Sequence, residues 1–260
     1  MDSKSYRLRE FISPVDGRSL VVDASAGLSL GVLPGMEHFA EAVKPLLPLA
    51  DGIVASPGQA GRLAGRSRTD AALLVRADWT NALRKPDFVL PPEMISYIPL
   101  VDPAEALDLG ASALVLNFLL GYEEQIEAGC LKNTVQLALQ GGQIGLPLIV
   151  DVQPSGPRVM LQSNAVELGI SYALEGGADG AAIPWPGPAS LVRILTMMAG
   201  LPVWIKPTSI EVAGIEMTAA LSLGVTGLWL NERLFALENP AATLDALRVR
   251  LHTQPALEQA

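Results

Sequence analysis

Residues 146–183 read LPLIVDVQPSGPRVMLQSNAVELGISYALEGGADGAAI, and this stretch contains the unit that decides the fold. A short apolar run, Pro147–Asp151, ends in a carboxylate, and a segment with helical spacing, Asn164–Glu175, follows it. Two glycines, Gly176 and Gly177, then precede the next apolar run. A continuous apolar run of about five residues is typical of a strand that is buried on both faces of a sheet.

The same unit recurs along the chain, and its apolar runs are predicted to be strands. These runs are Ser19–Asp23, Gly52–Ser56, Ala72–Arg76, Ala113–Asn117, Pro147–Asp151, Asp179–Ile183, Pro202–Lys206 and Thr226–Leu230. The segments predicted as helices are Glu37–Leu47, Pro103–Leu109, Glu123–Gln140, Asn164–Glu175, Pro188–Met198, Glu211–Leu223 and Pro240–Leu251. Many are followed by glycine, which favours the left-handed backbone after a helix, at Gly110, Gly141-Gly142, Gly176-Gly177, Gly200 and Gly224.

Strands that alternate with helices imply parallel pairing and right-handed crossovers. Repeated through 260 residues, this unit predicts an α/β fold with a single (β/α)₈ TIM-barrel domain over residues 1–260. An open doubly wound sheet is the alternative. Residues 78–99 interrupt the pattern as an insertion, either a lid or an interface element. We expect the tail from Thr253 to be frayed.

The composition excludes several classes of protein. Half of the residues are hydrophobic, which excludes a disordered chain. The net charge of −9 argues against a nucleic-acid partner. A single cysteine, Cys130, excludes a disulfide scaffold and fits a reducing compartment. The charged N-terminus and the short apolar runs predict no export signal and no membrane segment, so we expect a cytoplasmic protein.

Polar residues end the predicted strands or follow them closely. In a barrel of this kind the catalytic chemistry gathers at these carboxyl-terminal strand ends. A buried polar group without a partner costs about 1–3 kcal/mol, so their repetition at one end predicts a polar pocket. The residues expected to bind substrate there are Arg76, Asn117, Gln153, Trp185, Thr208, Ser209, Asn231 and Glu232.

Lys206 is the most informative of the residues at the strand ends. It ends the run Pro-Val-Trp-Ile-Lys, so its amine should project into the barrel mouth. Desolvation, or a second cation such as Arg76, would favour the neutral amine, which could attack a carbonyl compound and form a Schiff base. We expect Asp23 and Asp151 to act as acid/base groups or to orient Lys206. The alternative is that Lys206 pairs with Asp151 or Asp179 and only holds the pocket together.

No cofactor and no metal are expected. Asp23, Asp151 and Glu232 could bind a hard cation, but the sequence has no cluster of histidines or cysteines. The two histidines, His38 and His252, fall in segments predicted as helical. The sequence also lacks a Walker motif, a G-x-G-x-x-G dinucleotide motif and a G-x-S-x-G nucleophile motif.

The order of motifs from about Leu20 to Leu247 resembles the class I aldolases of the archaeal fructose-bisphosphate aldolase type, which are related to deoxyribose-phosphate aldolase. The segments that carry the resemblance are Pro34-Gly35-Met36-Glu37, Ser56-Pro57-Gly58, Val101–Asn117, Leu146–Gly156 and Gly224–Pro240. The resemblance implies a barrel, lyase activity on a small carbonyl compound and a homo-oligomer.

The chain also departs from that family at the residues that carry the family's catalysis and phosphate binding. The Schiff-base lysine of the family lies on the sixth strand, where this chain has Ala181-Ala182 and no lysine. Gln153 replaces the family's tyrosine. Thr208-Ser209 and Asn231-Glu232 replace its Gly-Gly and Gly-Arg loops, which bind a phosphate, so the substrate is expected to lack a phosphate there. Ile205-Lys206-Pro207 resembles the strand-seven lysine of deoxyribose-phosphate aldolase.

Three functions therefore stay open from the sequence. The first is an aldolase-like lyase that acts on a small carbonyl compound through a Schiff base on Lys206. The second is a catalytically silent or repurposed barrel that binds a metabolite or a partner. The third is carboxylate- or metal-assisted enolisation by Asp23 and Asp151.

Overall fold

Eight parallel strands close into a barrel in the computed structural model, which describes residues 3–63 and 71–253. Around the barrel the strand order is β1-β10-β9-β8-β7-β6-β3-β2. The strands are β1 (Ser19–Asp23), β2 (Gly52–Ala55), β3 (Ala72–Arg76), β6 (Ala113–Leu119), β7 (Leu148–Gln153), β8 (Gly180–Pro184), β9 (Val203–Lys206) and β10 (Gly227–Leu230). The predicted TIM barrel is confirmed, and the closure of β1 on β10 excludes the open sheet.

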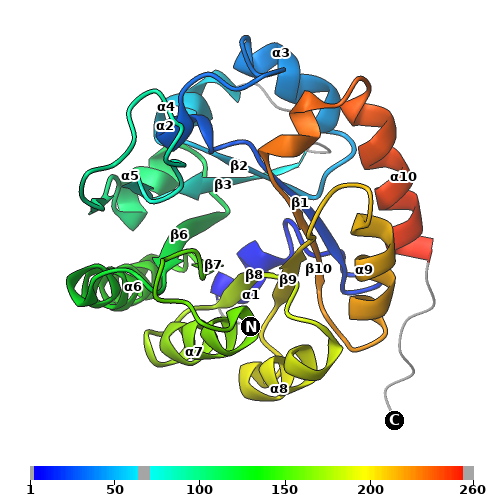
Figure 1. Cartoon of the computed structure of the whole chain (residues 1–260). Coiled ribbons are helices and arrows are strands. Elements are labelled where there is room, and N and C mark those ends of the chain that lie inside the picture. The colour runs from blue at the N-terminus through cyan, green and yellow to red at the C-terminus, as the bar shows by residue number, and fades with distance from the viewer. Residues whose placement is uncertain (1–2, 64–70, 254–260) are drawn as a thin grey trace.

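Helices surround the strands, as Figure 1 shows. The α-helices are α1 (Ser3–Leu8), α2 (Gly27–Leu30), α3 (Phe39–Val43), α4 (Pro57–Ala60), α5 (Pro103–Asp108), α6 (Glu124–Ile144), α7 (Gln162–Glu175), α8 (Pro188–Met198), α9 (Ala213–Leu221) and α10 (Pro240–Thr253). Three short 3₁₀ segments are η1 (Lys44–Leu46), η2 (Gly61–Leu63) and η3 (Glu232–Ala236). The helix predicted over Glu37–Leu47 is divided between α3 and η1, because Pro45 lies within it.

The end predicted for α6 is wrong. The sequence pattern places it before Gly141-Gly142, but the helix continues to Ile144 and ends at Gly145, which has φ 71°. Gly141 is required for a different reason. A Cβ there would lie 2.5 Å from the carbonyl oxygen of Leu146, so the helix packs directly against the chain that enters β7.

Helix α1 is an element that the sequence analysis did not predict. Its six residues have no buried member, and the segment lacks an apolar face. It is held by Lys4, whose ammonium lies 2.7 Å from Asp179 at the start of β8. Phe11, just beyond the helix, is 1% exposed and stacks on Trp204 with 5.8 Å between ring centroids. The N-terminal segment therefore closes the amino-terminal end of the barrel.

The strands are buried on both faces, which explains their continuous apolar runs. Side chains alternate between the barrel interior and the layer beneath the helices, because successive residues of a strand face opposite ways. The interior cluster includes Val21, Val54, Leu74, Ala113, Val115, Ile149, Ala182, Trp204 and Trp229. The other residues of the same strands join the larger cluster beneath the helices. The barrel is thus a packed core with Trp204 and Trp229 in its centre.

The predicted insertion contains a two-stranded antiparallel sheet of β4 (Asp78–Thr80) and β5 (Tyr97–Pro99). It lies against helix α2, since Trp79 donates to the carbonyl of Leu28 at 3.1 Å and Arg84 donates to that of Ser29 at 2.9 Å. Thr253, the first residue of the tail expected to be frayed, is still in α10, and residues 254–260 lie outside the described part of the chain. The predicted homo-oligomer stays a prediction.

Within residues 3–63 and 71–253, none of the helices has the length and hydrophobicity needed to cross a membrane.

The two neighbouring glycines of α6 give a stability prediction. We expect Gly141→Ala to destabilise the protein by about 1–3 kcal/mol, because the new methyl group would overlap the Leu146 carbonyl. Gly142→Ala is the matched control. Its Cβ would meet only the end of the Lys4 side chain at 4.0 Å, so helix propensity should stabilise the protein by about 0.5–1 kcal/mol. Urea unfolding of both variants measures the difference, and equal effects would contradict this account of the packing.

Candidate functional site

The polar residues at the strand ends point inward for a simple geometric reason. Each lies two residues after a member of the barrel's interior cluster, and strand side chains repeat their direction every second residue. Val21 is thus followed on the same side by Asp23, and Leu74 by Arg76. The other such pairs are Val115 and Asn117, Ile149 and Asp151, Trp204 and Lys206, and Trp229 and Asn231. The interior packing therefore continues upward into a polar layer.

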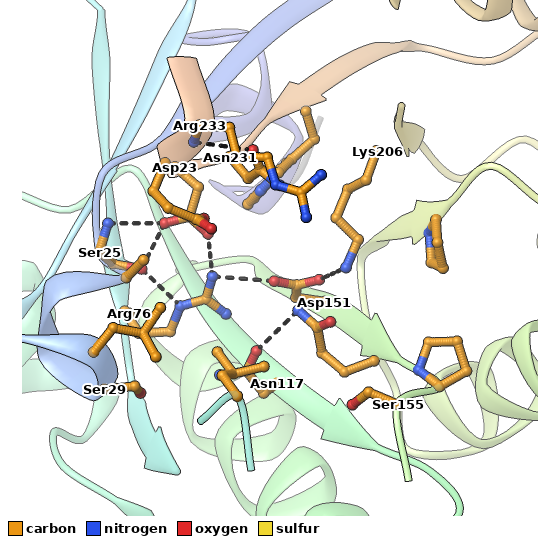
Figure 2. A pocket seen from close by; sticks show the side chains of 18 of the residues that line it. Asp23, Ser25, Ser29, Arg76, Asn117, Asp151, Ser155, Lys206, Asn231 and Arg233 are labelled. Carbon is orange, nitrogen blue, oxygen red and sulfur yellow. Dashed lines mark hydrogen bonds and ion pairs between the residues drawn. The ribbon is translucent and has the colours of Figure 1, made fainter. Parts of the chain in front are cut away.

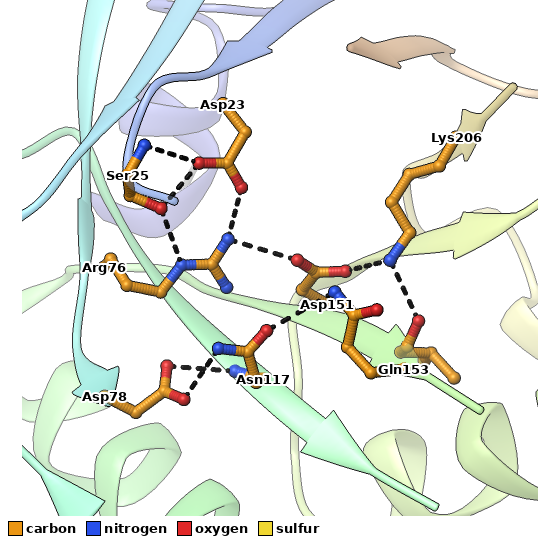
Figure 3. Close-up of polar contacts among 9 residues, drawn as sticks. Asp23, Ser25, Arg76, Asp78, Asn117, Asp151, Gln153 and Lys206 are labelled. Atoms are coloured by element: carbon orange, nitrogen blue, oxygen red, sulfur yellow. Dashed lines mark hydrogen bonds and ion pairs between the residues drawn. The ribbon is translucent and has the colours of Figure 1, made fainter. Parts of the chain in front are cut away.

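Four of these residues form a continuous chain of ion pairs. The Arg76 guanidinium donates through Nη2 to Asp23, and the same nitrogen lies 3.1 Å from Asp151 Oδ2. The other oxygen of Asp151 accepts from the Lys206 ammonium. Figure 3 shows this order, Asp23–Arg76–Asp151–Lys206, which we call the ion chain. Two carboxylates thus alternate with two cations.

The ion chain is deeply buried, and its neutrality makes that burial tolerable. The side chains of Arg76 and Asp151 are only 6% and 2% exposed, and an unpaired charge in such a place would cost several kcal/mol. Burial alone would raise the pKa of Asp151, but the neighbouring Lys206 and Arg76 cations outweigh it and lower that pKa. Although burial disfavours the Arg76 cation, Asp23 and Asp151 raise the pKa of its guanidinium.

Asp23 is held by a local turn as well as by Arg76. Its Oδ1 accepts from the backbone N–H and the hydroxyl of Ser25, at 2.9 and 2.5 Å. The Ser25 hydroxyl in turn accepts from Arg76 Nε at 3.1 Å. These contacts use both carboxylate oxygens of Asp23, so it positions Arg76. Ser25 was missed by the sequence analysis, although the spacing Asp-x-Ser after a strand is the signal that could have identified it.

Lys206 lies at the boundary between the ion chain and the cavity. Its side chain is 14% exposed, and its ammonium also donates to the carbonyl of Val152 at 3.0 Å. The sequence analysis expected Arg76 to act directly on Lys206, but Asp151 lies between the two cations and forms an ion pair with each. Asp179, the other partner considered for Lys206, pairs with Lys4 at the opposite end of the barrel.

Asp78 is a third carboxylate of the site, and it comes from the insertion. Its oxygens accept from the backbone N–H of Asn117 at 3.0 Å and from Asn117 Nδ2 at 2.8 Å. The residue is 1% exposed, and this burial raises its pKa to about 6. Burial also raises the pKa of Glu232, with a further contribution from the nearby Asp23. Two carboxyl groups of the site therefore bind a proton more readily than usual.

A cavity of about 630 Å³ opens above the ion chain, and Figure 2 shows its lining. The residues predicted at the site that line it are Asp23, Arg76, Asn117, Asp151, Gln153, Trp185, Lys206, Thr208, Asn231 and Glu232. Ser209 does not line it, and its side chain instead interacts with the Glu211 carboxylate, whose pKa it lowers. Thr208 lines the cavity, but its hydroxyl donates to Glu216 at 2.7 Å.

The cavity has further walls that the sequence analysis did not assign to it. Helix α2, which follows β1, contributes Leu28 and Ser29, and the insertion contributes Leu83 and Lys85. These residues follow the strand ends by several positions, so only the fold brings them over the site. Arg233, next to Glu232, supplies a cation at the rim.

The described residues contain no group of three or more His, Cys, Asp or Glu side chains that could hold a metal ion. Asp23 and Asp151, which were considered as ligands of a hard cation together with Glu232, already bind the Arg76 guanidinium. Asp23 and Asp151 are therefore not free to bind a hard cation as a pair.

Comparisons with known proteins support the resemblance that the motif order predicts. No protein-family model matches the chain. An uncharacterized aldolase of Saccharolobus solfataricus is 25% identical over 91% of this chain and 90% of that protein. The class 1 fructose-bisphosphate aldolase of Halobacterium salinarum is 25% identical over 60% of each chain. The structure of a Schiff-base-forming fructose-1,6-bisphosphate aldolase superposes with a TM-score of 0.79 at 19% identity, over 96% of this chain and 100% of that one.

The two named relatives agree with the fold and with the motif order, and together these findings support a class I aldolase-type family for this chain. Its sixth barrel strand, β8, contains no lysine, whereas the seventh, β9, ends in Lys206. The family resemblance is confirmed, and the departure at the strand-six lysine is a property of this chain.

The raised pKa of Asp78 predicts a specific pH dependence of stability. Because the folded-state pKa of about 6 lies above the ordinary value of 3.8, the folded protein holds this proton more tightly than the unfolded chain. The contribution of Asp78 to stability is therefore full below about pH 4 and is lost as the pH rises through 6. Relative to Asp78→Asn, the wild type should lose roughly 2–3 kcal/mol between pH 4 and pH 7.

Urea unfolding of the wild type and Asp78→Asn at a series of pH values measures this difference. Asp78→Asn is the reference because its amide has nearly the same shape as the carboxyl group but does not titrate. A stability difference between the two proteins that stays constant with pH would refute the assignment.

Proposed function

We propose that this chain is an aldolase-type carbon–carbon lyase that acts on a small carbonyl compound through a Schiff base on Lys206. The observation that supports the proposal most directly is the position of Lys206, an amine at the cavity floor with Asp151 as its counterion. The names of the relatives support lyase chemistry of the aldolase type. The Schiff-base-forming structural neighbour shares the barrel.

The ion chain suits a protonated Schiff base better than it suits most other adducts. An iminium on Lys206 carries the same positive charge as the ammonium that it replaces. Asp151 would therefore face one unit of positive charge before and after the reaction, and Arg76 would keep its own salt bridge. Because charge is expensive to bury without a partner, an adduct that preserves the charge of the site is favoured.

The two carboxyl groups have different roles in the reaction. Asp151, whose pKa is lowered, stays ionised and stabilises the iminium. Glu232, whose pKa is raised by burial, is the better proton carrier. Lys206 gives one ammonium proton to a cavity base and attacks the carbonyl carbon. That proton and a second proton from the Lys206 nitrogen pass to the carbonyl oxygen, which leaves as water, and an iminium stays on Lys206. Glu232 then takes the proton of the substrate's β-hydroxyl, the carbon–carbon bond breaks, and the electron pair moves into an enamine on Lys206.

These roles differ from those expected from the sequence, which placed acid/base chemistry on Asp23 and Asp151. Both are engaged by Arg76, and Asp23 also accepts two hydrogen bonds from Ser25. Glu232 was expected only to bind substrate. Its carboxylate at the end of β10 also disfavours an anionic group, so we propose a substrate without a phosphate at that position.

One observation favours a second candidate, a silent or repurposed barrel that binds a metabolite without converting it. Lys206 is held by both Asp151 and the Val152 carbonyl, an arrangement that also serves purely to brace the strand ends. The barrel mouth is nevertheless open above the amine, since Lys206 lines the cavity. The third function considered is carboxylate- or metal-assisted enolisation by Asp23 and Asp151. Either form would survive removal of Lys206, and the metal-assisted form would be lost in the presence of a chelator.

Borohydride trapping tests the proposed nucleophile. The protein is incubated with acetone or hydroxyacetone, reduced with sodium borohydride and weighed by intact mass spectrometry. We expect one reduced adduct per chain, located on the peptide that contains Lys206, and no such adduct in Lys206→Met. Any aldol cleavage found with a hydroxy carbonyl compound should fall by roughly 10³-fold or more in that variant.

Lys85→Met is the matched control, because Lys85 also borders the cavity but lies on the insertion, away from the ion chain. It should keep the adduct of the wild type. Absence of any adduct in the wild type, or its persistence in Lys206→Met, would contradict the proposed Schiff base and favour the silent barrel.

A further inference from the structure

The last turn of α10 lies between two carboxylates at the amino-terminal end of the barrel, which is the end opposite the cavity. His252 Nδ1 is 2.7 Å from Asp16 Oδ2, and its Nε2 is 3.3 Å from Asp51 Oδ2. Asp16 precedes β1, and Asp51 is the residue directly before β2. The three side chains are only partly exposed, at 15–23%. One imidazole ring therefore joins the C-terminal helix to the starts of two barrel strands.

This geometry requires a protonated ring. A neutral imidazole carries one N–H, so one of its two nitrogens would turn a lone pair toward a carboxylate oxygen. Only the imidazolium ion donates to both carboxylates, and it faces an opposite charge on each side. Asp51 and Asp16 accordingly raise the pKa of His252, although burial opposes them. His252 is also in the last turn of α10, where the helix dipole favours a cation.

The two carboxylates are held in place by backbone groups, independently of the histidine. Asp16 Oδ1 accepts the N–H of Arg18 at 3.1 Å, which closes a turn before β1. Asp51 Oδ2 accepts the N–H of Leu20 at 2.6 Å, which joins the start of β2 to β1. When His252 loses its proton, a neutral ring faces two carboxylates that still have these bonds. At least one of the two contacts then becomes repulsive.

We propose that Asp16, His252 and Asp51 form a pH-sensitive latch, which fastens the C-terminal end of α10 to the barrel while His252 is protonated and loosens the last turn when the proton leaves. The latch lies outside the candidate site, so it does not depend on the proposed function. It acts on the helix end, because the body of α10 is held by buried side chains such as Leu244 and Leu247.

A second contact at the same helix end does not titrate. The Arg18 guanidinium donates to the carbonyl of Leu251, the residue before His252. Both Arg18 and Leu251 are buried, at 6% and 0% exposure. Because arginine stays charged throughout the ordinary pH range, this contact persists when the latch opens. The opening is therefore a fraying of the helix end and leaves the rest of α10 in place.

The other charged groups on α10 and on the elements packed against it are exposed or far from the latch. Arg248, one turn before His252, and Lys44 of η1 are exposed, so solvent screens their effect on the ring. Arg250 extends toward Gly214 in α9. The charged residues of β1, α9 and η3 lie at the other end of the barrel, in or beside the cavity; they are Asp23, Glu216, Glu232 and Arg233. The two carboxylates of the latch therefore dominate the titration of the ring.

The direction of the pKa shift fixes the sign of the pH dependence. The folded protein binds the His252 proton more tightly than the unfolded chain, for which the ordinary pKa is 6.5. The latch therefore contributes fully below about pH 6.5, and its contribution is lost as the pH rises through the raised pKa of the folded protein.

NMR titration of the histidine ring protons tests the pairing. The chain has two histidines, so His252→Gln identifies the signal of each. We expect the His252 midpoint in the folded protein to lie above the midpoint of the same residue in the urea-unfolded chain. Asp51→Asn and Asp16→Asn should each lower the midpoint. Asp245→Asn is the matched control, because it removes the same charge from the exposed side of α10 and should leave the midpoint unchanged.

Hydrogen exchange followed by mass spectrometry tests the loosening. Protection factors of the backbone amides of residues 249–253, corrected for the intrinsic effect of pH, are compared at about pH 6 and about pH 9. We expect them to fall by about three- to tenfold in the wild type, the scale of a cation's interaction with a helix end. His252→Gln shares every other titration of the protein and should show the same, lower protection at both pH values. The amides of α6 are the internal reference, because a general loosening of the fold would affect them as well.

A His252 midpoint at or below its value in the unfolded chain would overturn the latch. Equal protection of residues 249–253 at the two pH values in the wild type would overturn it too, even with a raised midpoint, because the ion pairs would then not hold the helix end. A fall of the same size in His252→Gln has the same consequence. None of these readouts uses catalysis, so the result is independent of the proposed Schiff base.

Discussion

The neutrality of the ion chain is the constraint on which the candidate site depends. Asp151 is fully enclosed at the end of β7 and is shared by Arg76 and Lys206, so neither cation can be removed without leaving a charge unpaired. This coupling joins strands β1, β3, β7 and β9 across the barrel mouth. It also decides what a ligand can do there, because an adduct on Lys206 must keep a positive charge beside Asp151.

The site is built by extending the packing of the barrel by one layer. Trp204 and Trp229 fill the interior, and the residues two positions further along their strands, Lys206 and Asn231, enter the cavity. The apolar layer below excludes water from the ion chain, which strengthens its electrostatic interactions. The insertion and the segment after β1 that contains α2 cover the same end, so the cavity combines a floor made from the strand ends with walls made from connecting segments.

The sequence predicted the strands well, because apolar runs bounded by polar residues mark both ends of a buried strand. It predicted less about direction, since a run that is apolar on both faces does not show which residues point inward. Ser209 illustrates the limit, because it follows Lys206 closely in the sequence yet does not line the cavity and interacts with Glu211 instead. Helix α1 and the contact between Arg76 and Asp151 depend on tertiary packing, which no local pattern records.

The most direct test of this account is the titration of the Asp151 side-chain carboxyl by ¹³C NMR in the otherwise unmodified protein. If Arg76 and Lys206 hold its charge as the geometry indicates, the carbon resonance should show no titration above about pH 4, and its midpoint should lie below the ordinary value of 3.8. A midpoint at or above that value would mean that burial outweighs the two cations. The ion chain would then not be the organising feature of the site.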